Sequence, residues 1–177
     1  MKKYEIGLYE KAMRNTLTWK EKLQCAKECG YDYLEISIDA TEEKINRIYM
    51  DTEEKREIME AIFDTRIPIG SMSVSALTKY ALGDPDQAVR DRGMEIAEKS
   101  IQLSSALGVR TVMIPGYDIY YGESTIETKR YFLENIRKIA EIAEREGILV
   151  GFETMENNFM NTTGKAVQYV NMVDSAY

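Results

Sequence analysis

The sequence contains no histidine, and this absence excludes more chemistry than any other feature of its composition. Without histidine the chain has no Ser-His-Asp or Cys-His triad, no imidazole general base and no imidazole metal ligand. Any chemistry within these 177 residues must therefore depend on carboxylate, lysine, tyrosine or thiol groups.

Other features are scarce as well. Only two cysteines occur, which excludes a disulfide scaffold and indicates a reducing compartment. The sequence has no run of about 18 apolar residues and no apolar signal-peptide core near its start, so we expect a cytoplasmic protein that does not associate with a membrane. Lys and Arg number 23 against 30 Asp and Glu, a net charge of −7, and this acidic balance argues against a nucleic-acid partner.

What is present is typical of one globular α/β domain covering residues 1–177. Hydrophobic residues make up 44% of the chain, which is enough for a sizeable core. Short β-rich runs and longer helical patterns alternate five times. The strands are expected at 5–9, 33–37, 69–74, 111–114 and 148–153, and the main helices at 18–30, 52–63, 84–108, 127–147 and 163–173. Such alternation predicts parallel strands that are joined by right-handed helical crossovers.

Local signals set the expected helix ends. Thr18 is a suitable N-cap, and Gly30 stands where a helix commonly ends. Thr52 can cap the second helix, in which we expect Phe63 to belong to the apolar stripe. Pro85 is expected at the first helical position of the third helix.

Five βα units fit either part of an eight-stranded barrel or an open doubly wound sheet. No GxGxxG or GxxxxGK[ST] run follows any strand, so the phosphate loops common in open sheets are absent from the sequence. Polar residues instead recur near or just past the strand ends, as they do at the mouth of a barrel: Glu10, Glu35, Asp39, Ser75, Tyr117, Asp118 and Glu153. The pattern alone leaves both architectures open.

Several collinear motifs resemble those of the L-ribulose-5-phosphate 3-epimerase and hexulose-6-phosphate isomerase family. They cover essentially the whole chain: GLYEKA at 7–12, LEISID at 34–39, SMSVSA at 71–76, AVR at 88–90, GYDIYY at 116–121, FETM at 152–155 and MN at 160–161. The family belongs to the xylose-isomerase-like barrels, so the resemblance implies a (β/α)8 TIM barrel of which this chain supplies about five units.

The resemblance also implies a reaction and a site. Members of the family invert C3 of L-ribulose 5-phosphate, or isomerise a hexulose 6-phosphate, through an enediolate that a divalent metal (Mn, Zn or Mg) stabilises. Glu153 matches the first of the two glutamates that, with an aspartate and a histidine, hold this metal. In related epimerases that glutamate also exchanges a proton with the substrate carbon. The implied catalytic residue and metal ligand is therefore Glu153.

Four further residues are candidates for contact with a sugar-phosphate substrate. Tyr117 and Asp118 follow the fourth strand and can line the pocket or pack a loop against the rim. Lys11 can meet a phosphate or form a solvated charge pair with Glu10. Glu35 lies within a barrel strand, where a charged group needs a partner.

The resemblance places the sixth strand just beyond Tyr177, and the family's aspartate, histidine and second glutamate on strands six to eight. Because transition-metal sites need three or four ligands, we expect an incomplete site in this chain. We therefore weigh two hypotheses: a sugar-phosphate epimerase or isomerase represented by its N-terminal portion, and a non-catalytic remnant or subunit that needs another polypeptide. An open sheet of this kind would leave strand edges and an apolar interior exposed, so we also expect a homodimer.

Overall fold

A computed structural model describes residues 4–177 and contains one sheet of five parallel strands in the order β1-β2-β3-β4-β5. The strands are β1 (Gly7–Tyr9), β2 (Tyr33–Ser37), β3 (Ile69–Ser73), β4 (Thr111–Pro115) and β5 (Leu149–Glu153). The α-helices are α1 (Trp19–Glu28), α2 (Glu42–Asn46), α3 (Thr52–Thr65), α4 (Gln87–Ala106), α5 (Ile126–Glu146) and α6 (Thr163–Val173). The 3-10 helices are η1 (Glu10–Ala12), η2 (Arg47–Tyr49) and η3 (Ser75–Thr78). The predicted alternation of strands and helices is confirmed, and the strands follow one another around the sheet as in a TIM barrel.

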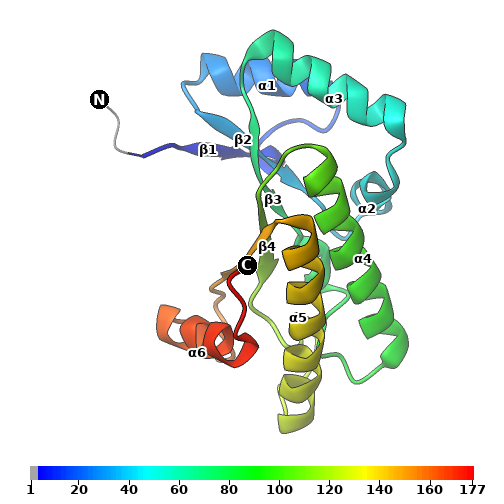
Figure 1. Cartoon of the computed structure of the whole chain (residues 1–177), viewed down its shortest axis with the longest axis vertical. Coiled ribbons are helices and arrows are strands. Elements are labelled where there is room, and N and C mark those ends of the chain that lie inside the picture. Colours follow the sequence, from blue (N-terminus) through cyan, green and yellow to red (C-terminus); the bar gives the residue numbers. More distant parts are fainter. Residues whose placement is uncertain (1–3) are drawn as a thin grey trace.

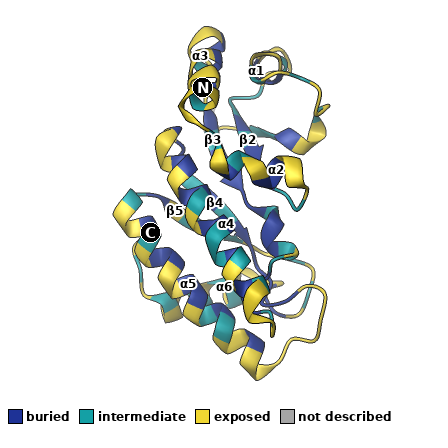
Figure 2. Cartoon of the chain, turned by 90° about the vertical axis from the view of Figure 1, so that its right-hand side faces the viewer, coloured by how far each residue is buried: buried dark blue, intermediate teal, exposed yellow. Residues whose placement is uncertain are grey.

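The two faces of the sheet differ in burial. Leu34 and Val112 point to one face and are fully buried under the helices. Glu35 and Thr111 point to the other face, which is the inner face of a barrel, and are half-buried there. Helices α1 and α3 lie side by side, and so do α4 and α5 (Figure 1). Buried and exposed residues alternate along α4 and α5, as expected for helices with one side on a sheet (Figure 2).

Two glycines make room for an aromatic ring at the start of the strands. A Cβ atom built on Gly7 would lie 2.2 Å from the ring of Tyr33, and one built on Gly70 would lie 2.6 Å from it. Because no real side-chain atom fits at these distances, the close packing of β1, β2 and β3 around Tyr33 requires glycine at both positions.

Most predicted helix boundaries agree with the structure, and two are corrected. Thr18 caps α1, as predicted, and the structure adds a capping box in which Glu21 completes the pair of hydrogen bonds. Asp51, rather than Thr52, caps α3, and Asp86 caps α4, so Pro85 precedes that cap instead of occupying the first helical position. In both corrected cases an aspartate carboxylate accepts a hydrogen bond from a backbone N–H of the first turn, which a neighbouring Thr or Pro does not.

The predicted apolar stripe of α3 is narrower than expected. Ile58 is fully buried, but Phe63 is 83% exposed because it lies on the side of α3 that faces away from the core. The short elements α2 and η2 were not predicted. None of the helices within residues 4–177 is long and apolar enough to cross a membrane.

Candidate functional site

Parallel strands place all their carboxyl ends at one edge of the sheet, and the predicted site residues lie at or near this edge. Lys11 follows β1, Glu35 lies within β2, Tyr117 and Asp118 follow β4, and Glu153 is the last residue of β5. These five residues thus come from four of the five strand regions.

Glu153, the predicted catalytic carboxylate, lies near other charged side chains. Its side chain is exposed at the free edge of the sheet, yet the surrounding protein limits its solvation, and Glu35 and Glu156 add negative charge nearby. These effects raise the pKa of Glu153 above its usual 4.5, and Lys11 partly opposes them. Glu35 itself accepts a hydrogen bond from the Ser71 hydroxyl at 2.6 Å. The structure therefore brings Glu35, Glu153 and Lys11 into one electrostatic neighbourhood.

Lys11 connects the loops that follow the first three strands. Its Nζ donates to Ser75 Oγ at 3.1 Å and lies 3.5 Å from Asp39 Oδ2. Burial alone would raise the pKa of Asp39, but hydrogen bonds from Thr41 and the charge of Lys11 hold it below its usual range. Lys11 thus has specific partners and does not form a solvated pair with Glu10.

Tyr117 is buried with its hydroxyl directed to a carboxylate. The phenol donates to Glu156 Oε2 at 2.6 Å, and the ring packs edge-on against Tyr120 at a centroid distance of 4.8 Å. Burial and the adjacent Glu156 charge raise the pKa of Tyr117 well above its usual value, so the phenol stays protonated at neutral pH.

Asp118 is fully buried and organises the loop between β4 and α5. Its Oδ2 accepts hydrogen bonds from Ser124 Oγ at 2.7 Å and from Thr128 Oγ1 at 2.6 Å, while its main-chain oxygen accepts one from Gly83 N at 2.9 Å. These contacts tie the loop to the first turn of α5. A contact between Asp118 and a substrate stays a prediction.

A buried charge cluster around Glu10 was not predicted. Glu10 Oε1 accepts from Lys22 Nζ at 2.6 Å and from Lys44 Nζ at 2.7 Å, and the Arg47 guanidinium donates to both carboxylate oxygens at 2.6 and 2.8 Å. Ser37 N adds a fifth hydrogen bond at 3.0 Å. Burial by itself would raise the pKa of Glu10, but its cationic partners outweigh that effect and hold the pKa far below its usual value.

This Glu10 cluster contains three cations and one carboxylate, all but Arg47 almost fully buried. The ring of Trp19 covers Lys22 and Arg47 at 4.9 and 4.8 Å. The cluster joins η1, α1, β2 and the α2–η2 segment immediately beside Lys11. The predicted helix at 18–30 already contained Lys22, which was the one signal for this cluster in the sequence. Nothing in the sequence indicated α2, which carries Lys44.

The described residues do not by themselves fit the divalent metal that the family resemblance implies. Within residues 4–177 no group of three or more Asp, Glu or Cys side chains is arranged to hold a metal ion. Glu153 could supply one oxygen ligand and has Glu35 nearby, but oxygen-ligand and transition-metal sites usually need more protein ligands than this.

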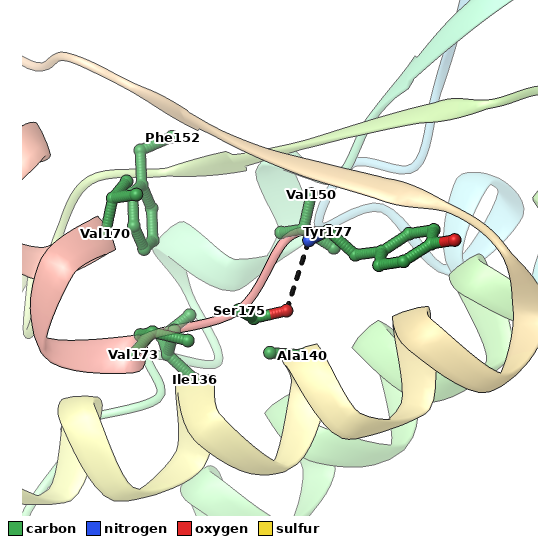
Figure 3. Close-up of a pocket in the computed structure, with 8 residues that line it drawn as sticks. All are labelled: Ile136, Ala140, Val150, Phe152, Val170, Val173, Ser175 and Tyr177. Atoms are coloured by element: carbon green, nitrogen blue, oxygen red, sulfur yellow. Dashed lines mark hydrogen bonds between the residues drawn. The ribbon is translucent and has the colours of Figure 1, made fainter.

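One apolar cavity lies on the helix side of the sheet, away from these carboxylates (Figure 3). It has a volume of about 60 Å³ and is enclosed by β5, α5, α6 and the last residues of the chain. Val150 and Phe152 of β5 face it, and Tyr177 N donates to Ser175 Oγ at its edge at 3.1 Å (Figure 3). Its apolar lining and small volume do not suit a phosphorylated sugar.

Comparison with known proteins identifies relatives along nearly the whole chain. Residues 23–177 match the family model of the xylose isomerase-like TIM barrel. The chain is 35% identical over 176 residues to L-ribulose-5-phosphate 3-epimerase UlaE of Escherichia coli O139:H28. This match covers 99% of the chain and 62% of the relative, so the chain spans about three fifths of the length of such relatives.

Solved structures with low sequence identity share the fold. A D-psicose 3-epimerase in the presence of D-fructose superposes with a TM-score of 0.81 at 20% identity, covering 98% of this chain and 61% of that one. A xylose isomerase-like TIM barrel protein from Mycobacterium smegmatis in complex with magnesium gives a TM-score of 0.74 at 15% identity, with 98% and 62% covered. With five consecutive parallel strands and a family match over most of its length, the chain belongs to the xylose isomerase-like TIM barrel family.

Proposed function

We propose that this chain forms the first five βα units of a sugar-phosphate 3-epimerase that converts L-ribulose 5-phosphate to L-xylulose 5-phosphate. Isomerisation of a hexulose 6-phosphate is the alternative within the same chemistry, because both reactions pass through an enediolate. The observation that carries the proposal is the position of Glu153 at the carboxyl end of β5, with its pKa raised by limited solvation, Glu35 and Glu156. The 35% identity to an L-ribulose-5-phosphate 3-epimerase supports the choice of substrate.

The proposed proton transfer needs a base with a suitable pKa. The hydrogen on C3 of a ketose is weakly acidic because it is adjacent to the C2 carbonyl. Glu153 would take this proton while the electron pair of the C3–H bond forms the enediolate and places negative charge on the C2 oxygen. A carboxylate with a raised pKa is a stronger base, which favours this step as long as the group is ionised.

The neighbouring side chains suggest how the substrate is held. We propose that Lys11 contacts an oxygen of the sugar, where its positive charge favours the developing enediolate. Glu35 raises the pKa of Glu153 and would accept a hydrogen bond from a sugar hydroxyl. Tyr117 and Asp118 belong to the loop beside this region, where Tyr117 provides a protonated phenol and Asp118 keeps the loop in shape.

Inversion at C3 requires a proton donor on the opposite face of the enediolate, and a single carboxylate supports exchange without inversion. The family resemblance implies a divalent metal, and Glu153 is the ligand that this chain would contribute to it. The remaining metal ligands would have to come from outside the described residues, because residues 4–177 contain no complete set.

The test is incorporation of solvent deuterium at C3 of L-ribulose 5-phosphate by the 177-residue chain, with and without Mn²⁺. We expect exchange that is lost in Glu153→Gln and kept in Glu141→Gln, a matched change on the exposed side of α5. Exchange no faster than in buffer would refute the catalytic proposal for this chain. The second hypothesis, a subunit without activity of its own, would then stand.

One observation favours that second hypothesis and a homodimer. Val167, Val170 and Met172 on α6 are each 49% exposed, and so is Leu149 on the inner face of the edge strand β5, so apolar surface is exposed on both of these last elements. We propose that the chain self-associates through the β5–α6 surface. Sedimentation velocity at micromolar concentration would show a dimer that Val170→Lys weakens, and a purely monomeric wild type would contradict the proposal.

A further inference from the structure

Two cysteines lie one helical turn apart at the end of α1. Cys25 is in the last turn of the helix, Cys29 is its C-cap, and the Cys29 N–H donates to the main-chain oxygen of Cys25 at 3.0 Å. Residues four apart lie on the same side of a helix, so the two side chains are neighbours. Both thiols are free, Cys25 being half-buried and Cys29 exposed. The end of α1 therefore carries an accessible dithiol.

The two thiols act on each other. Limited solvation raises the pKa of Cys25, and the charge of Cys29 and a hydrogen bond between the two side chains raise it further. Such a hydrogen bond requires the two sulfur atoms to approach closely. Because two thiolates at this spacing repel each other, a ligand that replaces both protons and neutralises both sulfurs is favoured by the arrangement.

The backbone beneath the dithiol is held by the hydrogen bonds that end the helix. Gly30 follows Cys29 in the left-handed region, with a φ of +80°, and Tyr31 N donates to the main-chain oxygen of Ala26 at 3.0 Å. These contacts fix the last turn of α1, which carries both cysteines. A fixed backbone reduces the ordering cost of binding a ligand between the two sulfurs.

The helical spacing suits a bridging atom better than a direct disulfide bond. Side chains four residues apart on a helix have their Cβ atoms about 5–6 Å apart. A disulfide needs Cβ atoms about 3.5–4.5 Å apart, so it would distort the last turn of α1. A single atom bound at about 2.3 Å from each sulfur spans a wider gap and leaves the helix in place.

The surroundings of the dithiol allow access and limit which ligand fits. A surface groove of about 430 Å³ runs along α1 beside Cys25, and its other lining residues are Lys20, Glu21, Gln24 and Glu28. Within residues 4–177 no group of three or more Asp, Glu or Cys side chains is arranged to hold a metal ion. Zinc, which usually takes four ligands, is therefore a poor match, and a centre that needs only two sulfurs is a good one.

We propose that Cys25 and Cys29 form a dithiol site that binds a thiophilic centre, such as trivalent arsenic, through both sulfurs. With an organic arsenic(III) oxide, both S–H bonds break and two As–S bonds form. The oxygen leaves arsenic with the two protons as water, and no atom changes its oxidation state. The last turn of α1 leads into β2, so the dithiol lies at the edge of the sheet opposite to Glu153. The site is therefore independent of the proposed epimerase function.

The test is the reaction of the folded 177-residue chain with one equivalent of phenylarsine oxide, followed by intact mass and by titration of the free thiols. We expect one arsenic atom per chain and the loss of both free thiols. Because the chain has only these two cysteines, the adduct reports on this pair alone. No adduct, or an adduct that leaves one thiol free, would overturn the proposal.

Two variants show whether both sulfurs and their spacing are needed. Cys29 is exposed, so Cys29→Ser should keep the fold, and we expect it to weaken binding about a hundredfold because chelation by two linked sulfurs is lost. Gln24→Cys combined with Cys25→Ser keeps two cysteines at a spacing of five residues, where helical side chains no longer face each other, and should bind as weakly. Wild-type affinity in either variant, or Zn²⁺ retained by the wild type through both cysteines, would contradict the two-sulfur assignment.

Discussion

The Glu10 cluster offers the sharpest test of how this fold is stabilised. Glu10→Gln keeps the size and shape of the side chain but removes the only carboxylate among three cations. Lys22 and Lys44 are nearly inaccessible to water, so neither can be solvated in place of its lost partner. Removing one partner from a buried ion pair typically costs about 3–5 kcal/mol, and we expect Glu10→Gln to lower the free energy of unfolding by about 4 kcal/mol.

The assay is urea unfolding at pH 7 with linear extrapolation to water. The only tryptophan, Trp19, stacks on two cations of the cluster, so its fluorescence reports on this region directly. Glu28→Gln on the exposed end of α1 is the control, with an expected cost below about 0.5 kcal/mol. The double variant with Lys44→Met should be less destabilised than the sum of the two single changes, because one unpaired cation is removed.

The pH dependence gives an independent check. The folded-state pKa of Glu10 is depressed, so its stabilising contribution is complete above the unfolded-state pKa and is lost as the pH falls toward the folded-state value. The difference in stability between wild type and Glu10→Gln should therefore be full above about pH 5 and should shrink below it. A cost below about 1 kcal/mol at pH 7, or a difference that does not change with acid, would refute the electrostatic reasoning.

Three further predictions follow from single sites. The carboxyl carbon of Glu153 should titrate above pH 4.5 by NMR, and Glu35→Gln should lower that midpoint because a repelling charge is removed. A midpoint that Glu35→Gln leaves unchanged would show that Glu35 does not raise the pKa of Glu153. Asp118→Ala should cost about 3 kcal/mol in urea unfolding, because two hydroxyl donors lose a buried acceptor, and a loss below about 1 kcal/mol would contradict this account. Gly7→Ala should cost about 1–3 kcal/mol through overlap with the ring of Tyr33, and Tyr33→Ala should relieve the overlap in the double variant; additive costs would argue against the clash.

The order of the elements was determined by the sequence itself. The spacing of apolar residues within each segment indicates whether it forms a strand or a helix. The five βα units and their parallel strands were therefore predictable from the sequence. The N-cap at Thr18 and the position of Glu153 at the end of β5 were predictable for the same reason, since both depend on neighbouring residues. The exposure of Phe63 was not predictable in this way, because which side of a helix meets the core depends on what packs there.

The tertiary structure decided which charges are buried and which side chains meet. Glu10 and Lys11 are adjacent in the sequence, yet Glu10 contacts cations 12, 34 and 37 residues away, and Lys11 contacts Ser75, 64 residues away. The crossovers between parallel strands bring such distant residues to one edge of the sheet, and no local pattern encodes those meetings. The raised pKa of Glu153 arises in the same way, because it depends on Glu35, which only the folded sheet brings near it.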